Sequence, residues 1–371
     1  MSDVTTSLDP RAAAVHTVRT LAIAACYYAA GRLGLLRELV IQDSVVSPIW
    51  PPTGVATAAL LVYGLRACPG IALGSLGIIL TLTTSPQLSA LGLVAGNTAA
   101  PVCGYLMLRR VGFRTDLARL RDGLSLVFLG AFGAMLISSG TGAGLLAATA
   151  GIGWQDFWPL WLSWWVGDAM GVLIVTPVLL LLHRLHRHLR RPWPRARWRE
   201  AVGLALVAGC LVPFATHSPA SLLFLVYPLV IWAALRFQLA GSMLCVLLAS
   251  VMATVAATEG TGPFRDMDRV EVMLNLQAFN GAIALTALLL SAVIAEQHHT
   301  RRSVERACQE LMEVLEHLTA GDTAPARPGE GTTTPPPPGR PSRDRPPGLP
   351  PVDRPPGPPP WDRPPPDRDT A

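Results

Sequence analysis

The stretch Trp-Trp-Val-Gly-Asp-Ala-Met-Gly at residues 164–171 decides the fold, because it places a carboxylate inside an apolar segment. The segment runs from about Trp158 to Leu182, which is long enough to cross a bilayer, and Asp168 falls near its middle. An ionised carboxylate at that depth costs about 3 kcal/mol even on insertion scales. We therefore expect Asp168 to be protonated, paired or exposed to a water-filled cavity. A functional role is the favoured interpretation, and a neutral side chain that serves packing alone is the alternative.

The composition is that of a membrane protein. Half of the residues are hydrophobic and 15% are charged, and several apolar runs reach the length of a membrane helix. This excludes a soluble enzyme with a tail anchor and predicts an all-α, polytopic integral membrane helical bundle. The first residues lack the apolar core and cleavage site of a signal peptide. The six cysteines are not spaced as a disulfide framework or a thiolate metal site.

The bundle is expected to contain eight to ten transmembrane helices. They span about residues 20–36, 51–65, 69–83, 88–108, 124–148, 158–182, 201–216, 221–235 and 239–257, with a last helix that ends near 295. A cytoplasmic N-terminus puts nearly all basic loops on one side, with Arg32 and Arg37 as exceptions. We therefore predict a multi-pass protein of the inner (plasma) membrane with both termini cytoplasmic. Because the second, seventh and eighth helices are short, eight full crossings with re-entrant pieces is an alternative.

Four parts are expected along the chain: an N-terminal cytoplasmic segment (1–16), the membrane domain (17–297), a cytoplasmic signalling helix (298–319) and a disordered proline-rich tail (320–371). In the third part, apolar residues recur at alternating spacings of four and three: Val304, Cys308, Leu311, Leu315 and Leu318. This seam is shorter than a secure coiled coil requires. A homodimer contact and a solvated helix therefore both remain open. For the tail, a plain spacer is favoured over a partner-binding segment.

Asn97 is the polar residue to compare with Asp168. In the expected topology their helices run in the same direction, and both residues lie about 15 Å deep at 1.5 Å per residue. Two polar groups at one depth can satisfy each other or share a cavity. The histidines at 183, 186 and 188 alternate with arginines, which opposes metal binding. We find no nucleotide loop or nucleophile–base pair, so we expect no enzyme, no catalytic residue, no metal and no cofactor.

Several motifs occur together in one order. They are Trp-Pro-Pro-Thr-Gly at 50–54, Gly-Asn-Thr at 96–98, the 164–171 stretch with Thr-Pro at 176–177, Tyr-Pro at 227–228, Leu-Arg-Phe at 235–237, Gly-Pro-Phe at 262–264 and Leu-Gln at 276–277. Over roughly residues 17–297 the chain resembles the first class of bacterial membrane-associated sensor (MASE) domains. The resemblance implies a membrane sensory module that is joined through a cytoplasmic helix to a histidine kinase or a cyclic-di-GMP enzyme.

The sequence departs from that pattern in two ways. No kinase, cyclase or phosphodiesterase region follows the helix at 298–319, and Gln238 stands where the resemblance predicts glycine after Arg-Phe. We therefore expect a stand-alone sensor, and we carry no enzymatic activity over.

The sensor would detect a small ligand or a partner membrane protein and relay it through the cytoplasmic helix. We expect the ligand- or signal-sensing residues to be Asp168, Asn97, Trp164, Trp165, Arg236 and Gln277. The expected partners are the lipid bilayer, a second copy, and a separate kinase, cyclic-di-GMP enzyme or membrane transporter, but not nucleic acid. The main alternative is a transporter or permease subunit with Asp168 and Asn97 lining a substrate path. A remnant that lost its output domain is the third interpretation.

Overall fold

The structure is a computed structural model, and it describes residues 10–36, 39–41, 44–82, 88–150, 153–188, 195–218 and 221–322. The chain divides into two compact units, residues 1–311 and 312–371. Everything below concerns the first unit except the C-terminal end of the last helix. Nearly all of the predicted disordered tail lies outside the described residues.

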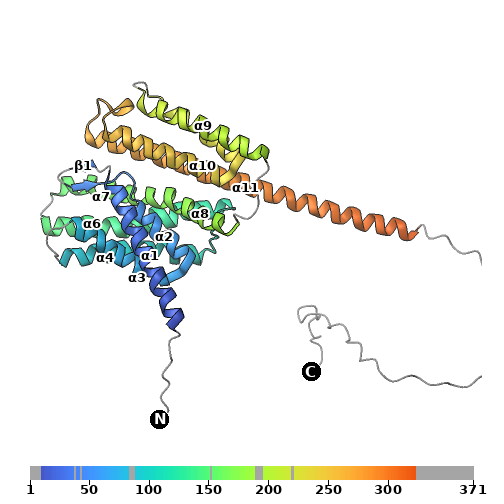
Figure 1. Cartoon of the computed structure of the whole chain (residues 1–371), viewed down its shortest axis with the longest axis horizontal. Helices are drawn as coiled ribbons and strands as arrows, with labels where there is room; N and C mark the ends of the chain where they lie inside the picture. The colour runs from blue at the N-terminus through green and yellow to red at the C-terminus, as the bar shows by residue number, and fades with distance from the viewer. Residues whose placement is uncertain are drawn as a thin grey trace, which may run out of the picture. The chain divides into compact units, whose positions relative to one another are not determined.

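Almost the whole described chain is helical (Figure 1). The α-helices are α1 (Pro10–Leu35), α2 (Pro51–Tyr63), α3 (Cys68–Leu82), α4 (Leu88–Arg110), α5 (Leu120–Ser125), α6 (Ala134–Ala150), α7 (Trp154–Met170), α8 (Thr176–His188), α9 (Arg195–His217), α10 (Val226–Thr258) and α11 (Arg269–Asp322). The π-helical stretches η2 (Leu126–Gly133) and η3 (Gly171–Val175) join α5 to α6 and α7 to α8. Short 3₁₀ turns are η1 (Gly64–Ala67), η4 (Leu223–Leu225) and η5 (Gly262–Phe264). The predicted all-α bundle is confirmed.

One short hairpin was not predicted. Strands β1 (Leu39–Ile41) and β2 (Ser44–Val46) pair antiparallel between α1 and α2, with Leu39 opposite Val46. The β-branched residues of these strands favour extended backbone. Three residues on each side are too few to produce a pattern that distinguishes a strand from a loop.

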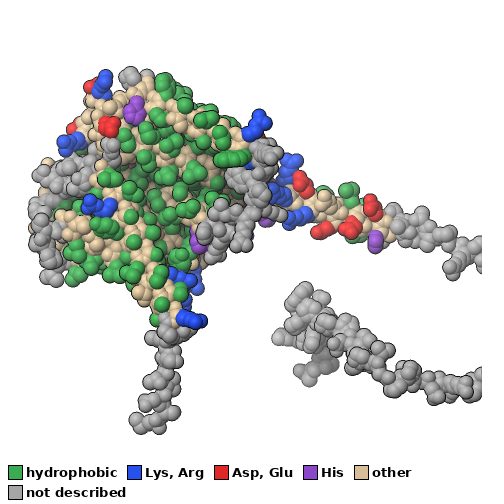
Figure 2. Space-filling model, in the orientation of Figure 1, with side chains coloured by type: hydrophobic (Ala, Val, Ile, Leu, Met, Phe, Trp, Pro, Cys, Tyr) green, Lys and Arg blue, Asp and Glu red, His purple; other side chains and the backbone are tan. Residues whose placement is uncertain are grey.

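The membrane character of the bundle is visible on its surface. In the described part of the chain, seven segments are long and apolar enough to cross a bilayer: Pro51–Leu82, Ser89–Arg110, Leu120–Thr149, Trp154–Leu185, Arg197–His217, Leu223–Phe264 and Arg269–His317. Many large apolar side chains are exposed, and Figure 2 shows them over much of the visible face of the bundle. Such a surface is stable only when hydrocarbon covers it. The chain is a multi-pass membrane protein.

The first of these segments is a hairpin. Gly70 at the start of α3 lies against Ile23 of α1, whereas Gly31 near the end of α1 lies against Ile78 of α3 and also approaches Pro52. Helices α1 and α3 are therefore parallel, and α2 runs antiparallel to both. The turn between α2 and α3 begins at Gly64, whose φ of 68° is a conformation that glycine adopts without cost.

The segment Leu223–Phe264 also folds back on itself. Helix α10 is interrupted at Gln238, whose φ of 53° and ψ of −142° are not helical. Beyond this point Gly241 packs against Phe237 and approaches the Ala233 carbonyl. At the far end Gly262 lies against Thr216 of α9. The two predicted helices 221–235 and 239–257 are therefore the two limbs of α10, which meet at a tight turn.

Counted by limbs, the described chain has α1, α2, α3, α4, α5–α6, α7–α8, α9, two limbs of α10 and α11, which makes ten. Helices α2 and α3 have 13 and 15 residues, fewer than the roughly 20 that span a bilayer. The predicted last transmembrane helix and the predicted signalling helix form one continuous helix, α11. Strong helix formers on both sides of Glu296 continue the backbone where the apolar pattern stops.

Candidate functional site

A cavity of about 160 Å³ lies beside Asp168. Its walls come from α1, α3, α4, α6, α7 and the segment before α2: Leu35, Ser47, Trp50, Ile78, Ile79, Leu82, Leu93, Asn97, Ser138, Gly142, Trp164, Gly167 and Asp168. Several of these residues stand near the end of α1, the end of α3 or the start of α4. The cavity therefore belongs to the end of the bundle opposite the arginines that follow α4.

The polar side chains of the cavity form a chain of hydrogen bonds. Asn97 is at its centre: its amide nitrogen donates to the Ser75 hydroxyl at 3.1 Å, and its carbonyl oxygen accepts from Ser138 at 3.1 Å. Ser138 also interacts with the carboxyl group of Asp168. Asn97 and Asp168 thus line one cavity, and Ser138 stands between them. Asp168 is only 7% exposed, so its surroundings are this cavity and its neighbours rather than bulk water.

Tyr27 of α1 is the unsatisfied member of this region. Its side chain is 1% exposed, and its hydroxyl lies near Ser75, Trp50 and Asp168, but no described residue forms a hydrogen bond of good geometry with it. A buried hydroxyl without a partner costs about 1–3 kcal/mol. A water molecule bound beside the hydroxyl would remove this cost.

The motif at 50–54 and the motif at 164–171 are hydrogen-bonded and closely packed against each other at the cavity wall. The Trp50 amide donates to the Gly167 carbonyl at 2.9 Å, and the Thr53 hydroxyl donates to the Asp168 carbonyl at 2.9 Å. A β-carbon built on Gly171 would overlap the Trp50 carbonyl, and one on Gly54 would overlap the Gly171 carbonyl. Small residues let membrane helices approach closely. Each motif therefore needs its glycines for this contact.

The π-helical stretch η3 begins directly after the Asp168 turn. It covers Gly171–Val175, and Thr176 immediately beyond it donates to the Gly54 carbonyl at 3.2 Å. A π-helical turn widens the backbone by one residue and is frequent at functional sites. Here the widening lies opposite the start of α2.

Among the predicted sensing residues, the two tryptophans have different environments. Trp164 lines the cavity, and its ring packs on Gly142 of α6. The indole nitrogen of Trp165 donates instead to the Phe132 carbonyl at 2.8 Å, which ties α7 to η2. Trp165 also stacks on Trp161 with ring centroids 5.7 Å apart, outside the cavity.

Gln277 and Arg236 lie away from the cavity. Gln277 of α11 is 5% exposed and donates to the Ser163 carbonyl of α7 at 3.0 Å. Arg236 pairs with Glu200 at the turn of α10, near the start of α9. The structure therefore brings Asp168, Asn97 and Trp164 to one cavity and places the other three predicted residues in helix-to-helix contacts.

Sequence reasoning missed Ser75, Ser138 and Tyr27. Each stands singly in an apolar helix, where serine reads as a small packing residue and tyrosine as an interfacial one. One signal was available, since Ser75 and Ser138 fall near the mid-depth of their own helices, as Asn97 does. Among the described residues, no group of three or more His, Cys, Asp or Glu side chains could hold a metal ion.

Comparisons with known proteins add one finding. Neither the curated proteins nor the solved structures contain a match. The MASE1 family model matches residues 19–298, which is most of the chain and includes every residue of the cavity. This membrane chain belongs to the MASE1 family of membrane-associated sensory domains.

Proposed function

We propose that this protein is a membrane sensor that detects a small ligand in the Asp168 cavity and relays its presence through α11. The observation that carries the proposal is the position of α7. One side of α7 forms the cavity wall with Trp164 and Asp168, and the other contacts α11. A ligand that displaces α7 must therefore also strain its bonds to α11.

Two contacts make the link between α7 and α11. In the first, the Gln277 side chain donates a hydrogen bond to the Ser163 carbonyl. In the second, Met170, two residues after Asp168, packs beside Gly281, which is one helical turn after Gln277. Both contacts belong to the buried core, where packed helices transmit displacement with little loss. A helix shift of about 1–2 Å is typical of such transitions.

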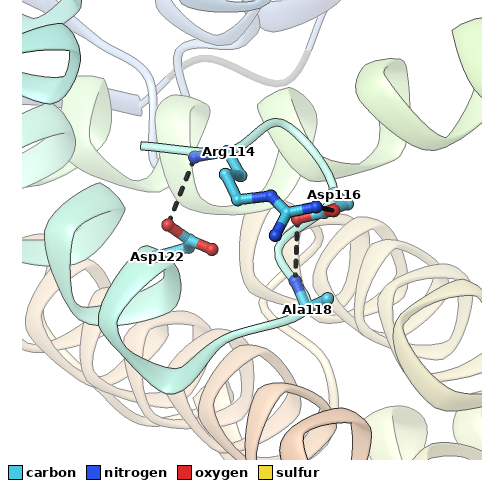
Figure 3. A network of polar contacts seen from close by, with 4 residues as sticks. All are labelled: Arg114, Asp116, Ala118 and Asp122. Carbon is cyan, nitrogen blue, oxygen red and sulfur yellow. Dashed lines mark hydrogen bonds and ion pairs between the residues drawn. The ribbon is translucent and has the colours of Figure 1, made fainter. Parts of the chain in front are cut away.

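A third contact holds α11 where it leaves the core. The Leu120 amide donates to Glu296 Oε2 at 3.0 Å. The loop before Leu120 is itself fastened, as Figure 3 shows: the Arg114 amide donates to Asp122 at 3.2 Å, and Arg114 pairs with Asp116 at 2.9 Å. The loop is therefore held in place, and a shift of α11 would change the position of Glu296 relative to it.

The topology that fits this function places the basic loops, including Arg109 to Arg121, in the cytoplasm. Both termini are then cytoplasmic, in the inner membrane of a bacterium, and α11 enters the cytoplasm beyond Glu296. The cavity is then in the outer half of the bundle, where a ligand from outside the cell can reach it. A separate kinase, cyclic-di-GMP enzyme or transporter would receive the signal.

The test measures α11 directly. Spin labels are placed on Cys308 and on Arg110→Cys at the end of α4, in a variant whose other cysteines are replaced and whose melting temperature matches the parent. Benzylamine, benzyl alcohol and benzoate serve as cavity probes. A probe that binds should shift the label-to-label distance by about 2 Å. Binding without any shift would refute the sensor.

Gln277→Leu separates binding from relay. It keeps the approximate volume of the side chain and removes the bond to Ser163, so binding should persist while the distance shift shrinks. Gln297→Leu, on the exposed surface of the same helix, is the control and should behave like the parent. Equal shifts in both variants would remove Gln277 from the relay.

Transport is tested by the same probes. A permease with Asp168 and Asn97 lining a substrate path predicts that proteoliposomes accumulate a bound probe faster than protein-free liposomes. The sensor predicts binding without accumulation.

A further inference from the structure

We infer that the cavity takes a small organic cation, a primary ammonium group on a compact aromatic or aliphatic body. This inference rests on the proposed function, since it names the class of ligand for the same cavity.

The charge of the wall favours a cation. Among the described residues that line the cavity, Asp168 is the only one with an ionisable side chain, and it is 7% exposed. A carboxylate in such surroundings is stable only with a positive partner or several donors. Two described hydroxyls lie near it, and neither carries a charge: Ser138 already donates to Asn97, and the other belongs to Tyr27. An ammonium group would supply the missing charge.

The uncharged part of the wall fits such a ligand as well. Trp50 and Trp164 both line the cavity, and indole rings attract cations through their negative faces. Leucine and isoleucine side chains from α1, α3 and α4 form the remaining apolar wall. An apolar body against these side chains and a cationic head at Asp168 therefore match the two halves of the cavity.

The hydrogen-bond acceptors in the cavity wall also suit an ammonium group. An ammonium group has three N–H donors, as a lysine side chain has. Besides Asp168, the Asn97 carbonyl oxygen, which also belongs to the cavity wall, keeps a second lone pair after accepting from Ser138. The wall thus offers two acceptors to an ammonium group, whereas a carboxylate or phosphate ligand would meet Asp168 with its own negative charge.

The volume limits the size of the body. An apolar cavity of about 150 Å³ in another protein holds benzene. The present cavity, at about 160 Å³, should hold a single ring or a short branched chain with one amino group. Because the cavity is partly open, a larger amine should fit only where the rest of its body lies outside.

The test compares three probes of similar size and different charge on the full-length protein in a non-ionic detergent at neutral pH. Benzylamine is cationic, benzyl alcohol is neutral and benzoate is anionic. Calorimetry should give a dissociation constant for benzylamine at least about tenfold lower than that for benzyl alcohol, and no binding of benzoate. Asp168→Asn should abolish the preference for the amine. Asp156→Asn, the same change near the start of the same helix and outside the cavity, should preserve it.

Equal binding of benzylamine and benzyl alcohol would overturn the inference, as would a preference for the amine that survives Asp168→Asn or no binding of benzylamine at all. The cationic class of ligand and the sensor function can fail separately, because one is tested by binding and the other by the label-to-label distance. If benzyl alcohol binds best and shifts the α11 labels, the sensor stands and the cationic class fails. If benzylamine binds best and shifts nothing, the class stands and the sensor fails.

The cation could be a soluble amine or the headgroup of phosphatidylethanolamine. Nanodiscs made of phosphatidylglycerol contain no lipid amine and provide the reference affinity for benzylamine. Weaker apparent binding in nanodiscs that also contain phosphatidylethanolamine than in nanodiscs with the same fraction of phosphatidylcholine, which has the same net charge, identifies the headgroup as the occupant, and equal binding identifies a soluble amine. Both results retain the cationic class.

Discussion

The hydroxyl of Thr53 donates a hydrogen bond to the backbone carbonyl of Asp168 at 2.9 Å, across 115 residues of chain. The same hydroxyl lies slightly closer to the Trp50 carbonyl, at 2.7 Å, so its hydrogen is shared between the two carbonyls and joins the start of α2 to the turn of α7 that carries the carboxylate. The two motifs that stand out in the sequence are thus two sides of one contact. Disturbing that contact should disturb the cavity.

Gly171→Ala should lower the stability of the protein. The new β-carbon would meet the Trp50 carbonyl, a backbone atom that cannot turn aside, and overpacking of this kind costs about 1–3 kcal/mol. The melting temperature in detergent measures the effect. Gly209→Ala in α9 is the control, because nothing lies near its added carbon, and it should melt at or slightly above the parent temperature. Equal melting of the two variants would contradict the close contact.

Gln238→Gly should raise the stability. Gln238 has a φ of 53° at the turn between the limbs of α10, a conformation that costs a non-glycine residue about 1–3 kcal/mol. Glycine removes the strain but gains freedom in the unfolded chain, so the net gain should be about 1 kcal/mol. Thermal unfolding would show a higher midpoint. A lower midpoint would mean that the turn differs from the one described.

Reporter fusions or cysteine labelling should place Arg114, Arg190 and Arg301 in the cytoplasm. The reason is that a cytoplasmic N-terminus would put nearly all the basic loops of the sequence on the cytoplasmic side, as the positive-inside bias favours. A membrane-impermeant thiol reagent should fail to label cysteines at these positions in intact cells and label them after lysis. External labelling at two of the three would refute the topology.

Leu311→Glu should weaken self-association if the seam on α11 is a contact between copies. Val304 and Leu311 are both exposed in the single chain, and a glutamate buried at the seam would have to lose its water without a partner. Sedimentation in detergent measures the loss of dimer. Gln309→Glu adds the same charge on the opposite side of the helix and should leave association unchanged. Equal association of both variants would favour a solvated helix.

The sequence was sufficient to predict the helical limbs of the bundle and the similar depth of Asn97 and Asp168 along their helices. Both follow from the spacing of charges and helix ends along the chain, because a membrane fixes depth by residue count. The unusual residue at 238 was also recognisable, and the structure explains it by a backbone conformation that suits glycine.

Other features depend on how helices face one another, which a single sequence does not record. Ser75 and Ser138 bond to Asn97 only because α3 and α6 pack on either side of α4. Gln277 and Arg236 were grouped with the sensing residues on motif alone, and rotation about α10 and α11 places them in other contacts. The π-helical stretch after Asp168 leaves no periodic trace long enough to detect.

Asp168→Asn should leave the melting temperature close to that of the parent, because the amide keeps the shape and can still bond to Ser138. Asp168→Leu should lower it, since the leucine places an apolar branch beside the hydroxyls of Ser138 and Tyr27 and can hydrogen-bond to neither, which leaves Ser138 with its bond to Asn97 alone. If Asp168→Asn melts like the parent, any loss of its response to a ligand reflects sensing and not unfolding.

The most direct test of the account is the distance between labels on Cys308 and Arg110→Cys in the Asp168→Asn protein, measured with and without saturating benzylamine. At the lowest concentration of benzylamine that saturates the parent, the parent should shift by about 2 Å, whereas Asp168→Asn, although folded, should remain mostly unbound and shift far less. A shift of the same size in Asp168→Asn at that concentration would contradict the claim that Asp168 recognises the ligand whose binding moves α11.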